Sequence, residues 1–196
     1  MNKTLNRISL AVVALLLAPV ANAHPFHGTA IGFSAGFFHP FLGLDHLLAM
    51  TAIGIWMGRQ STTPWKAWGG VSLLLVAGMM LGIAGLTLPA LDPLLAASVF
   101  MLGLLVTSTT TKNIAPTLLV GTFMLMHGMA HGMELPETLS VAEYGVGILV
   151  ATLTIQAVGL MAGKMLRQTE AGFSRGVGLI ISLIGALLFG NLLLVG

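Results

Sequence analysis

Side chains of the types that bind metals occur in two short groups, within segments that are otherwise apolar enough to span a membrane. The groups are His39, Asp45 and His46, and His127, His131 and Glu134. An ionisable side chain in the hydrocarbon region of a bilayer costs several kcal/mol, so such residues usually mark a functional site. Imidazole combined with carboxylate suits a divalent first-row transition metal. The two groups therefore predict a metal site within the membrane.

The composition places the chain in a lipid bilayer. Hydrophobic residues make up 56% of the chain and charged residues 7%, whereas soluble domains carry about 25% charged residues. The net charge of +2 comes from residues in short loops rather than from a surface patch, so we expect no nucleic-acid partner. Because cysteine is absent, nitrogen, oxygen or methionine sulfur must hold any metal. No Walker loop or phosphorylated-aspartate motif occurs, so we expect no ATP coupling in this chain.

The start of the chain has the pattern of a cleavable signal peptide over residues 1–23. A basic start precedes an apolar run and a small-residue cleavage site, and the apolar run is short for a membrane span. The mature chain, residues 24–196, would begin with His24, whose α-amine and imidazole could chelate a metal, with His27 nearby. The alternative is that both histidines are incidental, and the sequence leaves this choice open.

After residue 23 the sequence predicts six transmembrane helices in a single all-α domain. Prolines, charges and turn residues separate six apolar stretches, each near the roughly 20 residues that cross hydrocarbon. The stretches are 39–58, 67–86, 94–110, 116–135, 141–163 and 173–195. Short connections favour antiparallel packing of sequence neighbours. The apolar segment 28–38 has two possible arrangements. It would extend the first helix through a kink at Pro40, or it would be an interfacial or re-entrant segment that covers the outer side of the protein.

Glycines and methionines within the apolar stretches are expected to serve packing. Glycines such as Gly78, Gly82, Gly85, Gly159 and Gly163 let membrane helices approach closely. The methionines of the fourth stretch are expected to fill the core or face lipid, although their thioethers could assist soft ions. They are Met124, Met126, Met129 and Met133.

The basic residues after residue 23 favour one orientation. An exported N-terminus would place the loops after the first, third and fifth stretches in the cytoplasm. Every Lys and Arg of the mature chain lies in or beside those loops: Arg59, Lys66, Lys112, Lys164, Arg167 and Arg175. Asp92, Glu137 and Glu143 fall on the other side. The positive-inside rule therefore predicts a bacterial inner-membrane protein with both mature termini in the periplasm.

This orientation predicts that the two ligand groups meet. The first stretch runs inward from His39 and the fourth runs outward towards Glu134, and each group spans roughly 10 Å of helix. His39, placed at a helix start by the following proline, should lie at the depth of Glu134, and His46 at that of His127. Helical spacing puts His131 on the face of His127, so up to six donors would surround one cavity. Three plus three helices, each half beginning with a ligand group, also fit an inverted repeat.

Both groups lie within motifs of a known membrane protein family. Residues 39–46, HPFLGLDH, resemble the HPxxGxDH motif of the HupE/UreJ family of nickel permeases, and residues 127–134, HGMAHGME, resemble its HGxxHGxE motif. The signal peptide, the mature length and the six-helix plan also match, so the resemblance covers essentially the whole chain. It implies a secondary transporter that supplies nickel(II), or cobalt(II), for hydrogenase or urease maturation. It also implies that the motif histidines and carboxylates handle the ion, with no prosthetic group.

Other functions use the same residue types. A membrane-embedded zinc hydrolase could use the histidines as ligands and Asp45 or Glu134 as a general base, but it needs an open coordination position and an acyl-chain groove. A bis-histidine haem protein would leave both carboxylates without a role. We therefore expect a carrier rather than an enzyme. The sequence leaves open the metal, the driving force, the recipient enzyme and whether the chain forms a homo-oligomer.

Overall fold

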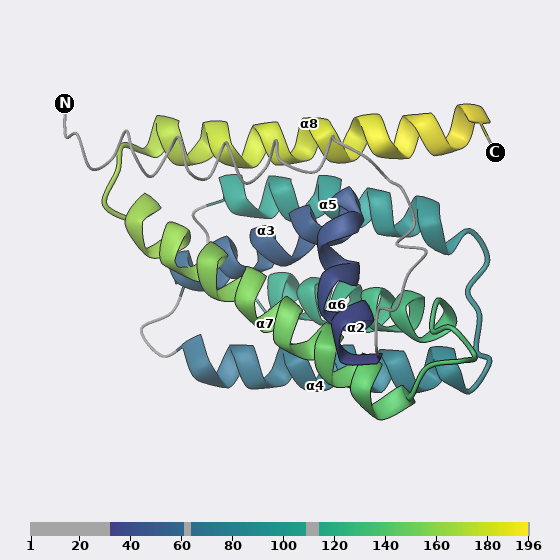
Figure 1. Cartoon of the computed structure of the whole chain (residues 1–196). Helices are drawn as coiled ribbons and strands as arrows, with labels where there is room; N and C mark the ends of the chain where they lie inside the picture. The colour runs from purple at the N-terminus through teal and green to yellow at the C-terminus, as the bar shows by residue number, and fades with distance from the viewer. Residues whose placement is uncertain (1–31, 61–63, 109–113, 196) are drawn as a thin grey trace. The chain divides into compact units, whose positions relative to one another are not determined.

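The computed structural model describes residues 32–60, 64–108 and 114–195, and every regular element in these ranges is an α-helix (Figure 1). The helices are α2 (Gly32–Leu42), α3 (Leu44–Gln60), α4 (Pro64–Ile83), α5 (Leu91–Thr107), α6 (Ala115–Met133), α7 (Val141–Leu166) and α8 (Ala171–Val195). Five of the six predicted stretches correspond to single helices, α4 to α8, with ends shifted by a few residues, whereas the first stretch covers the end of α2 and most of α3. The predicted signal peptide, His24 and His27 lie outside the described residues.

Several described helices are long and apolar enough to cross a membrane. Three single helices meet this condition, over Lys66–Ile83, Val141–Leu166 and Ala171–Leu194, and α2 with α3 meet it as a bent pair. The apolar helix α5 is shorter, and α6 carries two histidines that reduce its hydropathy. Length and composition thus support an all-α membrane protein, with up to four spans in the described ranges.

The first predicted helix is in fact two helices. The axes of α2 and α3 differ by 82°, so His39 lies on α2 while His46 lies on α3. The break falls at Gly43, where a Cβ would come within 2.9 Å of Asp45 Oδ1 and 3.1 Å of His46 Nδ1. Pro40 does not place His39 in an extended start, because the proline lies inside α2 and removes only one backbone donor.

The described part of the segment before Pro40 packs against α7. A Cβ on Gly36 would collide with the backbone carbonyl of Tyr144, and one on Gly147 would collide with that of Phe33. These collisions show that the two backbones touch, as small residues allow between membrane helices. The bend lies at Gly43 and not at the predicted Pro40, and an 82° bend is compatible both with a broken span and with a re-entrant segment.

The extensive helix contacts join elements that are distant in sequence. These pairs are α5 with α8, α4 with α6, α3 with α7 and α2 with α7 (Figure 1). The prediction that each helix packs mainly against its neighbour in the sequence is therefore wrong, because none of these four pairs is consecutive in the chain. The reason is that the glycines, which permit the closest backbone approach, meet the backbones of helices that are not consecutive in the chain.

The glycine contacts also give the direction of each pair. Along α4, Gly78 meets the backbone of Leu125 and Gly82 meets that of Met129, so α4 and α6 run parallel. The same reasoning makes α3 parallel to α7, because Gly54 meets Gln156 and Gly58 meets Leu160. These contacts are backbone to backbone, so an added side chain would separate the helices.

The α5 and α8 pair runs in opposite directions. Gly103 of α5 meets Ser182 of α8, whereas Gly185 further along α8 meets Phe100 earlier on α5. Gly85 does not share this packing role, contrary to prediction. It follows the end of α4 with a φ of +84°, and a Cβ added there would meet nothing within 4 Å. Gly85 is therefore a turn glycine rather than a packing glycine.

Candidate metal centre

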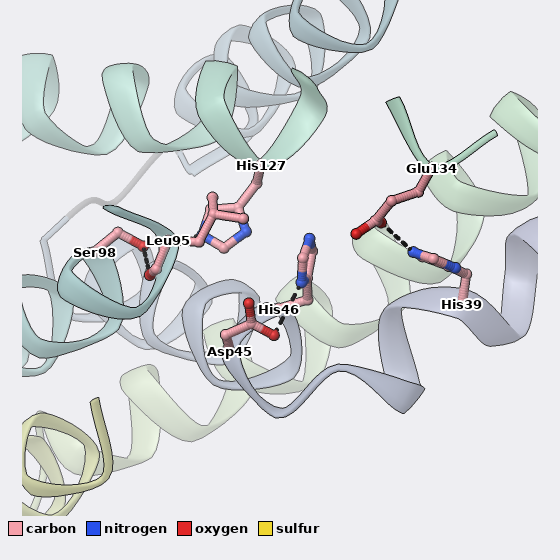
Figure 2. A network of polar contacts seen from close by, with 7 residues as sticks. All are labelled: His39, Asp45, His46, Leu95, Ser98, His127 and Glu134. Carbon is pink, nitrogen blue, oxygen red and sulfur yellow. Dashed lines mark hydrogen bonds and ion pairs between the residues drawn. The ribbon is translucent and has the colours of Figure 1, made fainter. Parts of the chain in front are cut away.

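Imidazoles from α2, α3 and α6 converge where α3 begins and α6 ends (Figure 2). The ring centroid of His46 lies 4.8 Å from that of His127 and 4.5 Å from that of His131. The centroid of His39 lies 5.1 Å from that of His131. The predicted meeting of the two groups is thus confirmed. Because α3 and α6 are not among the extensively packed pairs, these rings bridge a space between the helices.

Two of the histidines, His39 and His46, each form a hydrogen bond with a carboxylate. The imidazole of His39 donates through Nε2 to Glu134 Oε2 at 2.8 Å, and His46 donates through Nδ1 to Asp45 Oδ1 at 3.1 Å (Figure 2). The first bond confirms that His39 and Glu134 lie at one depth. The second holds the proton of His46 on Nδ1 and leaves Nε2 as the ring atom with a free lone pair. A carboxylate that orients an imidazole in this way typically raises its basicity as a metal ligand.

The orientation of His127 is set by a residue that the sequence did not single out. The hydroxyl of Ser98, on α5, lies 2.6 Å from the carbonyl oxygen of Leu95 and 3.0 Å from Nε2 of His127. A carbonyl can only accept, so the single hydroxyl proton goes to Leu95 and the ring of His127 donates its Nε2 proton to Ser98. The lone pair of His127 is then on Nδ1.

Several of these ring nitrogens are buried without a partner in the described part of the chain. They are His46 Nε2, His127 Nδ1 and both ring nitrogens of His131. Leaving a buried polar atom unpaired costs about 1–3 kcal/mol. The histidine cluster therefore concentrates unsatisfied electron-pair donors in one place, which is the arrangement that a bound cation would satisfy.

His131 connects two adjoining sets of donors. With His39 and Glu134 it offers three ligand atoms that all lie within 4.8 Å of one another. With His46 it makes the closest ring contact of the cluster, 4.5 Å between centroids. Its side chain is fully buried, whereas those of His39 and Glu134 are 30% and 47% exposed. An ion could therefore pass from the exposed set to the buried set while keeping His131 as a ligand.

A cavity of about 470 Å³ opens beside the cluster. His39, Asp45, His46 and Glu134 line it, whereas His127 and His131, which were predicted to face the same cavity, do not. Two further polar residues line the same cavity, Asp92 at the start of α5 and Asn191 near the end of α8. The sequence marked Asp92 only as an outer acidic residue. Asn191 has a signal that could have been used, because it is a lone amide in the apolar run of α8.

The opposite ends of the same helices form a basic region. Arg59, at the end of α3, and Arg167, just after α7, line a second cavity of about 260 Å³. Arg59 is fourteen positions after Asp45, which corresponds to about 21 Å of helix. Asp45, Asp92 and Glu134 therefore lie with the histidine cluster at one end of the helices, the acidic end. Arg59 and Arg167 lie at the other end, the basic end, where Glu170 is the one described carboxylate beside them.

Comparison with known proteins gives one consistent result. A family model described as HupE / UreJ protein matches residues 11–188. The chain is also 36% identical over 190 residues to Protein HupE of Rhizobium leguminosarum bv. viciae. The aligned region covers 93% of this chain and 97% of that relative. No solved structure matches the chain. Both matches span most of the chain, and the chain belongs to the HupE/UreJ family.

Proposed function

We propose that this protein is a secondary transporter that carries a divalent transition metal, with nickel(II) as the preferred cargo and cobalt(II) as the second, for hydrogenase or urease maturation. The observation that carries the proposal is the convergence of buried, unpaired imidazole nitrogens from α3 and α6 beside a polar cavity. Imidazole suits nickel(II), and the carboxylates at the cavity suit harder, hydrated ions at entry. The nickel assignment follows from the resemblance of the two motifs.

The donor arrangement supports a stepwise capture of the ion. Asp45, Asp92 and Glu134 line the cavity together and attract cations into it. The ion then exchanges bound water for His39, Glu134 and His131, and next for His46 and His127. Since each step replaces some ligands while retaining others, no step requires a bare ion. We propose that an ion gradient drives the movement, without ATP and without a prosthetic group.

The membrane arrangement that we propose has six spans, with the acidic end in the periplasm of a bacterial inner membrane and the basic end in the cytoplasm. The pair directions support it: α3 is parallel to α7, α4 is parallel to α6, and α5 is antiparallel to α8. Six consecutive crossings require this combination. The proposal includes a cleaved signal peptide over residues 1–23 and both mature termini in the periplasm.

An inverted three-plus-three repeat accounts for the helix pairing. In such a repeat, α3, α4 and α5 correspond to α6, α7 and α8. The pair of α3 with α7 then corresponds to the pair of α6 with α4, and the pair of α5 with α8 corresponds to itself. Both of the first two pairs are packed through glycines spaced four residues apart. The ligands break this relation, because an inverted repeat would place the second group at the opposite end, whereas both groups lie at the acidic end.

Uptake of radioactive nickel by cells expressing the protein tests the proposal. We expect uptake above that of cells with an empty vector, reduced most strongly by excess unlabelled nickel, less by cobalt and least by zinc. His127→Ala and His131→Ala should abolish it while the protein still reaches the membrane. Uptake equal to the empty vector despite normal protein amounts would contradict the proposal.

A further inference from the structure

A second buried polar layer lies about one helical turn away from the histidines, on the side away from the cavity. Met50 follows His46 by four residues on α3, and Met124 precedes His127 by three residues on α6, so each methionine shares a face with a histidine. Gln156 of α7 lies between the two methionines. Its Nε2 donates to Met50 Sδ at 3.7 Å and to Met124 Sδ at 3.6 Å. All three side chains are fully buried.

The orientation of the Gln156 amide is fixed from the other side. The indole of Trp68 on α4 donates to Gln156 Oε1 at 2.9 Å. An indole nitrogen can only donate, so this bond assigns the oxygen of the amide to Trp68 and turns the NH₂ group towards the two sulfurs. Thioether sulfur is a weak acceptor that core packing does not require to point at a donor. Here the lone pairs of two methionines converge on one point.

Polar groups along α7 connect this layer to the histidine cluster. Thr152 and Gln156 are four residues apart and share a face of α7, whereas Tyr144, eight residues before Thr152, lies about 80° further around the helix. The Tyr144 ring centroid lies 5.9 Å from that of His39. The hydroxyls of Tyr144 and Thr152 are buried and have no hydrogen-bond partner among the described residues. Buried polar atoms of α7 thus occur over about 18 Å of the helix axis, from the outer histidine to the methionine layer.

We propose that Met50, Met124 and Gln156 form a second binding station, which the same divalent metal ion occupies after it leaves the histidines. The inference rests on the proposed function and adds the next position on the route. The two sulfurs exchange the amide N–H groups for the ion, and Gln156 turns its Oε1 towards the metal, so the Trp68 indole N–H loses its acceptor while the station is occupied. Two thioethers and an amide oxygen hold a divalent ion less tightly than imidazoles do. A weaker site after a stronger one favours release, as multi-site conduction requires.

Sulfur removal at constant side-chain volume tests this station. In the double variant Met50→Leu with Met124→Leu, the histidines and the cavity are unchanged, and Met-to-Leu exchanges are well tolerated in packed cores. We expect the maximum rate of nickel uptake to fall roughly tenfold, the scale seen when a group supporting a metal site is removed. The first equivalent of nickel should still bind to the purified variant with wild-type affinity.

A matched control uses a methionine of α6 that points elsewhere. Met129 is buried and lies about 140° around the helix from Met124, so Met129→Leu should transport nickel like the wild type. X-ray absorption of purified protein with two equivalents of nickel(II) gives a readout that does not depend on transport. Because the chain has no cysteine, any nickel–sulfur signal must come from methionine. We expect it in the wild type and in Met129→Leu but not in the double variant.

The outcomes separate this station from the transport function itself. Absence of nickel uptake by the wild type would reject the proposed function, and the absorption measurement would then still test the station. Wild-type uptake by the double variant would overturn the station. So would absence of the nickel–sulfur signal in the wild type, even if the double variant transported slowly, because the sulfurs would then serve packing alone.

Discussion

The carboxylate of Asp45 acts on the centre through His46, whose Nδ1 proton it accepts at 3.1 Å. In Asp45→Asn the amide oxygen can still accept this proton, so the geometry survives while the negative charge is lost. We expect nickel uptake to fall by roughly 10- to 100-fold, as for other carboxylates that orient a metal-binding imidazole, with an unchanged amount of protein in the membrane. Uptake and immunoblotting of membranes measure both quantities.

Glu137→Gln is the matched control for that variant. Glu137 is an exposed carboxylate in the loop after α6 and does not line the cavity. Its neutralisation should leave uptake within experimental error of the wild type. Equal losses in the two variants would show that net charge matters and that the contact with His46 does not.

Ser98 makes a separate prediction about His127. In Ser98→Ala the Nε2 proton of His127 loses its acceptor, so the ring can also place its proton on Nδ1, where it competes with the metal. We expect weaker nickel binding by purified protein, with a dissociation constant raised by roughly tenfold. Ser72→Ala is the control, because the Ser72 hydroxyl donates only to a backbone carbonyl of its own helix. Unchanged affinity in Ser98→Ala would reject this role.

At the scale of the elements, glycines divide into those that position the site and those that join helices. A Cβ on Gly43 would press on the ends of the Asp45 and His46 side chains, whereas one on Gly132 would collide with the backbone carbonyl of Met79. We therefore expect Gly43→Ala to lower uptake several-fold with little change in melting temperature. Gly132→Ala should lower the melting temperature, because α4 and α6 must move apart.

Gly69→Ala controls for the general effect of replacing a helical glycine. A Cβ at Gly69 of α4 would meet nothing within 4 Å, and alanine favours the helix by roughly 1 kcal/mol. Its melting temperature should stay the same or rise. Thermal unfolding in detergent, followed by fluorescence, compares the three variants. A loss of stability in Gly43→Ala as large as that in Gly132→Ala would contradict the division.

At the scale of the whole molecule, the acidic and basic ends make the orientation testable. The chain contains no cysteine, so single cysteines can be labelled without background. Glu137→Cys, near the histidine end, should react with a membrane-impermeant maleimide in spheroplasts. Arg167→Cys, near the basic end, should react only after the membrane is permeabilised. Both positions are exposed, so the reverse labelling pattern would mean the opposite orientation.

The sequence predicted the positions of the helices and the convergence of the histidines better than it predicted the packing of the helices. Apolar stretches and their breaks gave six helix positions because hydrocarbon thickness sets helix length. Helical spacing and alternating direction placed His46 beside His127, as observed. The bend at Gly43 was missed because Pro40, the stronger breaker in isolation, is tolerated near the end of α2. Ser98 was missed because helix periodicity alone does not show which side chain of the neighbouring helix it meets. Asn191 was missed because it lines the cavity with residues of helices that are not consecutive with α8.

Counterflow in proteoliposomes tests the central claim most directly. Purified protein is reconstituted into liposomes loaded with unlabelled nickel, and entry of a trace of radioactive nickel is followed, so that the assay needs no knowledge of the driving force. We expect rapid accumulation of label with the wild type, and none above empty liposomes with His46→Ala or His127→Ala. Accumulation by these variants at the wild-type rate, or none with correctly inserted wild-type protein, would contradict a transport route through this histidine cluster.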